Sequence, residues 1–141
     1  MTTGIEDFPN GFANPKTIFS PVHEAVHVYK VAGKAEYHAI CEFQDTNDIR
    51  HFALAVAPHP AGPWTMKNER YATGQQLRFS EAVPYWTVEV SHGEAIRSGC
   101  DQRIEYDPAQ TRWLIQGLPE GAHAGPYEAL PWSLGLIELV Q

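Results

Sequence analysis

Short apolar runs, separated by glycine, proline and polar turns, follow one another along most of the chain. In the run at 49–57, every second residue from Phe52 to Val56 is large and apolar, and this period of two is typical of a β-strand. Further strands are predicted at 25–31, at 37–43 and near 64–67. No amphipathic helical stretch interrupts these runs, so the pattern favours a meander of short strands.

The second half of the chain repeats this scheme. Residues 103–106 alternate polar and apolar, and Asp107-Pro108 starts a turn because Asp caps it and Pro fixes φ. We expect 113–117 to return as the hairpin partner of 103–106, and 135–140 to form a last strand. The predicted fold class is therefore all-β, and repeated small antiparallel units suggest propeller blades, with a sandwich as the alternative.

Length and composition limit the functions that such a chain can have. Its 141 residues suggest one domain or part of one, and 17 acidic against 10 basic residues give a net charge of −7. This balance argues against nucleic acid as a partner, which needs clustered Lys and Arg. No apolar run is long enough to predict a membrane span, and the N-terminus does not resemble a signal peptide. Two cysteines do not predict a disulfide framework.

One motif, His23-Glu24-Ala25-Val26-His27, matches the H-E-x-x-H pattern of zinc peptidases. That pattern binds zinc only on a helix, where residues four apart share one face. The β-branched residues around it favour a strand, in which the two imidazoles stand roughly 13 Å apart. No zinc is therefore expected here.

A strand makes Glu24 the more interesting residue. Its position groups it with Val26 and Val28, which we expect to form a core face. A carboxylate at the mouth of an apolar face has a raised pKa, as a general acid needs, because desolvation disfavours its charge. The alternative is a Glu at the strand end that reaches solvent.

Several stretches carry motifs in a fixed order. They are Phe8-Pro9-Asn10-Gly11-Phe12, His23–Val31, Tyr37–Glu42, Ser91–Arg97, Asp101-Gln102, Asp107-Pro108, Leu114–Gly117 and Tyr127–Trp132 with Gly135-Leu136. In this order and spacing they resemble the motifs of the glycoside hydrolase family 62 α-L-arabinofuranosidases, and the resemblance covers nearly the whole chain.

The resemblance implies a five-bladed β-propeller, of which residues 1–141 would be the C-terminal portion of the catalytic domain. That portion corresponds to about two to three blades without a second domain. It also implies a secreted, extracellular enzyme that removes arabinofuranosyl branches from xylan or arabinoxylan by an inverting mechanism. The expected partner is then arabinoxylan or an arabino-oligosaccharide.

The resemblance further assigns roles to single residues. Glu24 matches the general acid, and His92 matches a residue associated with a bound calcium ion. The residues expected to bind substrate are Tyr127, Glu128, Arg97 and Gln102, with Glu128 standing where the family has an Asn that contacts xylan. The alternatives are a hydrogen-bonded structural role for His92, since Ca²⁺ prefers oxygen ligands, and packing beneath a loop for Tyr127.

Other side chains near these motifs have less specific expectations. His23 replaces an apolar residue before the acid; its imidazolium would lower the pKa of Glu24, but strand alternation is expected to point it away. Glu42 and Glu94 either fix the pocket or are solvated. The tryptophans Trp86, Trp113 and Trp132 are expected to be core or blade-packing residues.

The general base of the family, an Asp of the first blade, has no match in this chain. Asp7, Asp45 and Asp48 do not stand in a context that resembles it. We therefore expect the chain to be inactive alone, since inverting hydrolysis needs two carboxylates. The alternatives are a non-catalytic carbohydrate-binding relative and a truncated remnant, and open sheet edges make self-association an expectation in either case.

Overall fold

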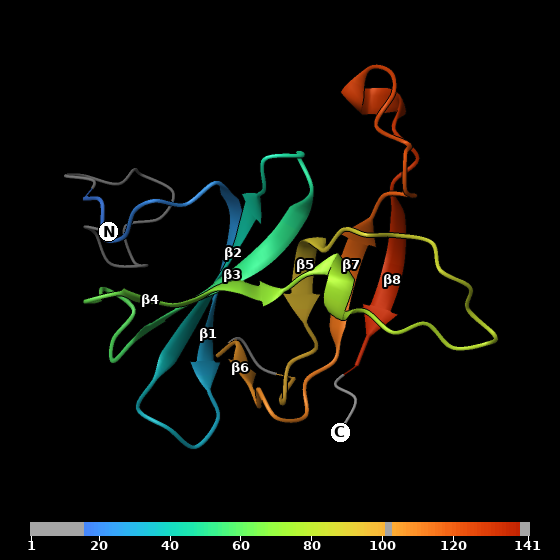
Figure 1. The fold of residues 1–141 in the computed structure, drawn as a ribbon. Helices are drawn as coiled ribbons and strands as arrows, with labels where there is room; N and C mark the ends of the chain where they lie inside the picture. Colours follow the sequence, from blue (N-terminus) through green and yellow to red (C-terminus); the bar gives the residue numbers. More distant parts are fainter. Residues whose placement is uncertain (1–15, 101–102, 139–141) are drawn as a thin grey trace.

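The structure, a computed structural model, describes residues 16–100 and 103–138 (Figure 1). These ranges contain strands and two short 3-10 helices: β1 Glu24–Val31, β2 Tyr37–Gln44, β3 Arg50–Ala57, β4 Thr65–Ala72, η2 Gly74–Gln76, β5 Ser91–Ala95, β6 Glu105–Tyr106, β7 Trp113–Gly117, η3 Tyr127–Ala129 and β8 Ser133–Ile137. The predicted all-β class is confirmed. Within the described ranges, no helix has the length and apolar character needed to cross a membrane.

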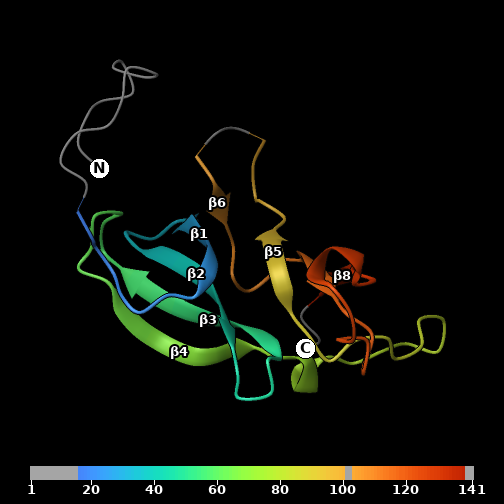
Figure 2. The same ribbon diagram turned by 90° about the horizontal axis from the view of Figure 1, so that it is seen from above.

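The strands form two sheets. The first has the order β4-β3-β2-β1-β6, and its strands β1 to β4 make the antiparallel meander that the apolar runs predict. The second has the order β5-β7-β8 and is antiparallel throughout. Figure 2 shows the two sheets standing side by side.

One predicted pairing is wrong. Residues 113–117 do not form a hairpin with 103–106, because β6 pairs with β1 in parallel whereas β7 lies between β5 and β8. The turn at Asp107 does form, since its Oδ1 accepts a hydrogen bond from the backbone N of Ala109 at 2.9 Å. This turn carries the chain from the first sheet to the second. The apolar pattern of the sequence does not predict β5, the first strand of that second sheet.

The main core lies between the two sheets. Its buried members are Tyr29, Val31, Ile40, Phe52, Leu54, Val90, Ala95, Tyr106, Trp113 and Ile115. Burying one side chain of this size contributes about 1.5–3 kcal/mol. A Cβ atom on Gly93 would lie 2.5 Å from the ring of Phe52, so the close approach of β5 to β3 requires glycine at this position.

The other face of the first sheet is also covered. Ala39, Cys41 and Ala55 are buried there, and Phe19 and Trp64 pack against them. Burial raises the pKa of the Cys41 thiol to about 11, which leaves it protonated and unreactive. β3 therefore has both faces in the interior, which fixes the position of its first residue, Arg50.

Candidate active site

A β-bulge at the start of β1 decides where Glu24 points. Glu24 pairs with Glu42 and His27 with Ile40, so β1 carries one residue more than β2 over this stretch, and Ala25 takes a φ of 49°. The extra residue reverses the alternation. Glu24 thus shares the core face with Glu42 and Ile40.

The expected grouping of Glu24 with Val26 and Val28 is consequently wrong. Val26 is 46% and Val28 38% exposed, and the core is reached by Tyr29 and Val31 instead. Simple period-two counting fails here because it runs across the bulge.

Glu24, Glu42 and Arg50 form a charged cluster at this end of the first sheet. Nη1 of Arg50 donates to Oε1 of Glu24 at 2.6 Å and also to Oε1 of Glu42, which is completely buried. The second oxygen of Glu42 accepts from the Oγ of Ser91 at 2.9 Å and from the backbone N of His92 at 2.7 Å. The buried carboxylate is therefore satisfied from both sheets.

The pKa of Glu24 is lower than usual, in contrast to the expected increase. Burial raises this pKa, but the charge of Arg50, its hydrogen bond and the charge of His92 together outweigh burial. His23 does not point away as expected, because its Nε2 lies 3.8 Å from Oε1 of Glu24. In this chain Glu24 is therefore held in its ionised form.

His92 lies beside the same cluster, next to a second bulge. The β5–β7 register shifts between Ser91 and Glu94, and His92 takes a φ of 36°. Its Nδ1 lies 3.3 Å from Oε2 of Glu42 and 3.1 Å from Oγ of Ser91. Non-glycine residues at positive φ are strained, and such strain is concentrated at functional sites. Two strained bulges thus border one carboxylate cluster.

Glu24, Glu42 and His92 each offer one ligand atom, and these atoms lie within 4.8 Å of one another. Ca²⁺ takes six to eight oxygen ligands, whereas this set holds one imidazole and two carboxylates that Arg50 already bridges. These three residues do not fit a calcium centre by themselves. Neither His23 nor His27 belongs to the group, and their motif lies partly in a strand rather than on a helix.

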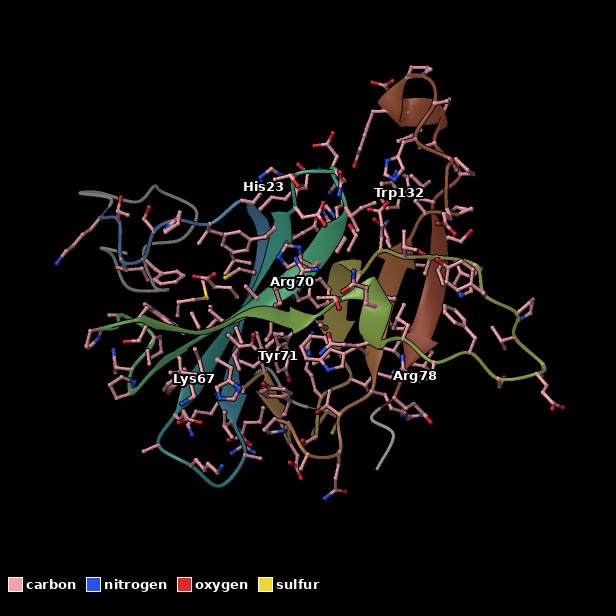
Figure 3. The ribbon with its side chains drawn as sticks, in the orientation of Figure 1. His23, Lys67, Arg70, Tyr71, Arg78 and Trp132 are labelled. Carbon is pink, nitrogen blue, oxygen red and sulfur yellow. The ribbon has the colours of Figure 1, made fainter. Side chains whose placement is uncertain are left out.

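Aromatic rings cover the other side of Arg50. Its guanidinium carbon lies 5.8 Å from the ring centre of Tyr127 and 5.3 Å from that of Trp132, which is cation–π distance. Tyr127 is 56% exposed, so it does not simply pack beneath a loop. Figure 3 labels Trp132, and His23 lies at the same end of the molecule.

The three tryptophans named above therefore differ in role. Trp113 is a core residue, as expected. Trp86 packs against β7 and β8, since Cβ atoms on Gly117 and Gly135 would lie 2.6 Å from its ring. Trp132 is half-buried, and its ring lies against Arg50 and Tyr127, so its packing role stays a prediction.

Two expected substrate-binding residues, Arg97 and Glu128, are not brought into this cluster. Arg97 pairs with Glu94 at 2.7 Å, and both side chains are largely exposed. Glu128 is exposed on η3. Gln102 lies outside the described residues. Their assignment to substrate stays a prediction.

The sequence reasoning missed Arg50 and Ser91, and left Glu42 undecided. A signal for Arg50 was present, because it has the same parity as Phe52 and Leu54 on an apolar strand. A charge on a predicted core face needs a partner. No comparable signal marks Ser91, whose partner Glu42 is 49 residues away.

Glu42 does not fit the role of the second catalytic carboxylate. Glu42 is too close to Glu24 and is fully buried, whereas inverting enzymes keep the two carboxyl groups about 6.5–9.5 Å apart to admit water. Asp45 closes a turn through bonds to the backbone N of Asn47 and of Ile49. Asp7 lies outside the described residues.

Comparison with known proteins decides the family. Residues 1–138 match the model of glycosyl hydrolase family 62. The chain belongs to this family. It is 32% identical over 127 residues to α-L-arabinofuranosidase C of Cellvibrio japonicus (strain Ueda107). This alignment covers 85% of this chain and 19% of that protein.

Solved family 62 structures agree with this assignment. The catalytic domain of a Coprinopsis cinerea family 62 α-L-arabinofuranosidase matches with a TM-score of 0.86 and 34% identity, covering 96% of this chain and 45% of that one. An α-L-arabinofuranosidase of Podospora anserina, in complex with cellotriose, gives 0.85 and 33%, with 96% and 44% covered. These structures are β-propellers. The chain thus spans less than half the length of the family 62 structures it matches.

Proposed function

We propose that this chain is the part of an inverting α-L-arabinofuranosidase that supplies the proton donor, Glu24. The observation that carries this proposal is the bulge, which turns Glu24 out of the regular alternation into a cluster with Arg50 and the ring of Tyr127. In the reaction, Glu24 gives its proton to the xylosyl oxygen as the bond from that oxygen to the arabinofuranosyl anomeric carbon breaks. Water attacks that carbon from the opposite face and gives its proton to a general base.

The general base would come from polypeptide outside the described residues. The lowered pKa of Glu24 supports this view, because an acid that is ionised near neutral pH is a poor proton donor. A further carboxylate placed beside Glu24 would raise its pKa again. The proposal thus includes inactivity of the chain by itself.

The proposed substrate is an arabinofuranosyl branch on a xylan chain in the extracellular medium. Tyr127 and Trp132 offer exposed or half-buried rings beside the acid, suited to the apolar face of a sugar. The relatives support a β-linked backbone, since one structure holds cellotriose and another family 62 hydrolase holds xylotriose. Glu128 in place of an Asn would alter the contact with that backbone.

A sugar-binding module without catalysis is the second candidate. It is favoured by the ion pair that keeps Glu24 ionised together with aromatic side chains at the same site. Calcium bound through His92 stays a prediction of the family resemblance, and its test is the metal content of the purified chain.

Self-association is part of the proposal as well. Leu114 pairs with Leu136 across β7 and β8, and Leu134 lies on the same exposed face. Such an apolar face is normally covered. Light scattering of the purified chain is expected to show a dimer, and Leu134→Glu is expected to yield monomers; aggregation instead would favour a truncated remnant.

The proposal is tested by incubating the purified chain with arabinoxylan and with an arabinofuranosyl-substituted xylotriose. We expect saturable binding without release of arabinose, and release only after addition of a polypeptide that carries the remaining family 62 blades. Glu24→Gln should abolish that release while leaving binding intact. Arabinose release by the chain alone, lost in Glu24→Gln, would sink the part of the proposal that requires a second polypeptide. Binding that never leads to release would favour the sugar-binding module.

A further inference from the structure

Glu89 is a fully buried residue, and its carboxylate contacts the backbone of Arg50 at the start of β3. It stands in the segment that leads into β5. Its Oε2 accepts a hydrogen bond from the backbone N of Arg50 at 3.4 Å, and the next residue, Val90, donates its N–H to the carbonyl of Arg50 at 3.1 Å. Glu89 and Val90 therefore hold the Arg50 backbone through both its N–H group and its carbonyl oxygen.

The same segment holds the loop that leads to Tyr127. The Oγ of Thr87 donates to the carbonyl oxygen of Leu118, at the start of the loop, at 2.9 Å. Further along, Nε2 of His123 lies 2.8 Å from Oε1 of Glu89. The loop then continues into η3, which begins with Tyr127. Two attachments thus connect the loop to the segment before β5.

Burial distinguishes the Glu89–His123 pair from an ordinary surface ion pair. No aligned hydrogen-bond donor in 16–100 and 103–138 reaches Oε1 of Glu89, so the imidazole is what compensates this oxygen. Removing one partner of a buried pair leaves the other without compensation, which is strongly unfavourable. The imidazole is 39% exposed, so the loop can detach on the solvent side while the core stays closed.

We propose that Glu89 and His123 form a positioning pair, which fixes the loop at 118–126 so that Tyr127 stays over Arg50. Glu89 holds Arg50 through the backbone, and His123 holds the loop, so the Glu89–His123 contact joins the two sides of the 5.8 Å ring–guanidinium contact. The pair acts through Tyr127 and does not itself touch substrate. Its effect on sugar binding rests on the proposed function, whereas its effect on the loop does not.

Other ionisable groups face this pair. Arg50 and Glu42 act on Glu89, and Asp45, His51, Arg70 (labelled in Figure 3) and Glu120 line a cavity of about 270 Å³ together with His123. Burial raises the pKa of Glu89, and the charge of His123 opposes this increase. The imidazole is therefore the group that faces the buried carboxylate from the loop.

The test compares His123→Ala, His123→Gln and the control His59→Ala, on the turn between β3 and β4, with the wild-type chain. Amide hydrogen-exchange protection of 118–126 is measured under identical conditions for all four chains. We expect His123→Ala to lower protection there about tenfold and to leave β1–β3 unchanged. The Gln amide can still donate to Glu89, so His123→Gln should restore protection. Wild-type protection of this loop in His123→Ala would overturn the proposal.

Sugar titration separates this inference from the proposed function. If the wild type binds an arabinofuranosyl-substituted xylotriose, His123→Ala should weaken that binding severalfold. Equal affinity in spite of a loosened loop would overturn the positioning of Tyr127 by the pair. If the wild type does not bind the sugar, the proposed function fails, and the exchange experiment still decides whether the pair holds the loop.

Discussion

The face shared by β1, β2 and β3 has two ends of different chemistry. At one end, Arg50 bridges the carboxylates of Glu24 and Glu42, and the Glu24 side chain is 40% exposed. At the other end, Tyr29 and Tyr106 are completely buried, and the hydroxyl of Tyr106 bonds to Nδ1 of His38. The charged end is open to solvent, as a site for a polar ligand must be. The aromatic end is closed and joins the two sheets.

A single strand reaches both ends because its alternation is broken once. Without the bulge at Ala25, Glu24 would point to the same side as Val28, away from Arg50. The bulge therefore places a carboxylate on a core face without exposing Tyr29 or Val31. One inserted residue therefore separates the residues that stabilise the core from the candidate chemistry along a single strand.

The largest effect is expected from Arg50→Met at the charged end. It leaves Glu42 buried without a counter-charge, so the free energy of unfolding should fall by about 3–5 kcal/mol at neutral pH. Urea denaturation measures this change. The control Arg97→Met removes an exposed pair, which solvent screens, and should change the free energy of unfolding far less. Equal losses in the two variants would contradict the importance of burial at this end.

At the aromatic end, Tyr106→Phe removes the hydroxyl that bonds to buried His38, and we expect a loss of about 1–3 kcal/mol. Tyr127→Leu, which removes the exposed ring on η3, should change stability by less than about 1 kcal/mol. Sugar affinity should show the reverse order, with a decrease in Tyr127→Leu, because the ring proposed to pack on the sugar is lost, and none in Tyr106→Phe. If both variants lowered both quantities alike, the two ends would not be separate in function.

Much of the fold follows from local pattern, because the strands carry their own periodicity. The run at 49–57 predicts β3 and the face of Phe52 and Leu54, and both are confirmed. The pairing of β6 with β1 could not be predicted in this way, since it joins residues far apart in sequence. The bulge was also hidden, because Ala25 is not a residue that marks positive φ.

The candidate site was predictable only in part, for a related reason. Family motifs identify Glu24, His92 and Tyr127, and all three lie around Arg50 or its partner Glu42. The partners themselves come from the pairing of strands, which no single motif contains. The predicted direction of the Glu24 pKa shift is wrong because that shift depends on Arg50. The period-two pattern of the sequence does not show that Arg50 lies beside Glu24.

A smaller effect of opposite sign is expected from Ala25→Gly. Glycine adopts positive φ without the steric cost that alanine has, so we expect a gain of about 0.5–1 kcal/mol in the free energy of unfolding. The control Ala32→Gly has no positive φ to relieve and should cost a similar amount. A loss in Ala25→Gly would indicate that the bulge is not strained.

The smallest effects are differences in the pH dependence of stability, and they distinguish Glu24 from Glu89. The pKa of Glu24 is lowered on folding, so its contribution is fully present above the usual Glu range and is lost as the pH falls through the lowered pKa. The pKa of Glu89 is raised, so stability is greatest below that range and declines as the pH rises through the raised pKa. In urea denaturation at a series of pH values, the free energy of unfolding of Glu24→Gln should therefore fall less at acid pH than that of the wild type. For Glu89→Gln, it should no longer decline as the pH rises above the usual Glu range. Equal changes of slope in both variants would show that the open site and the buried segment behind it do not differ in electrostatics.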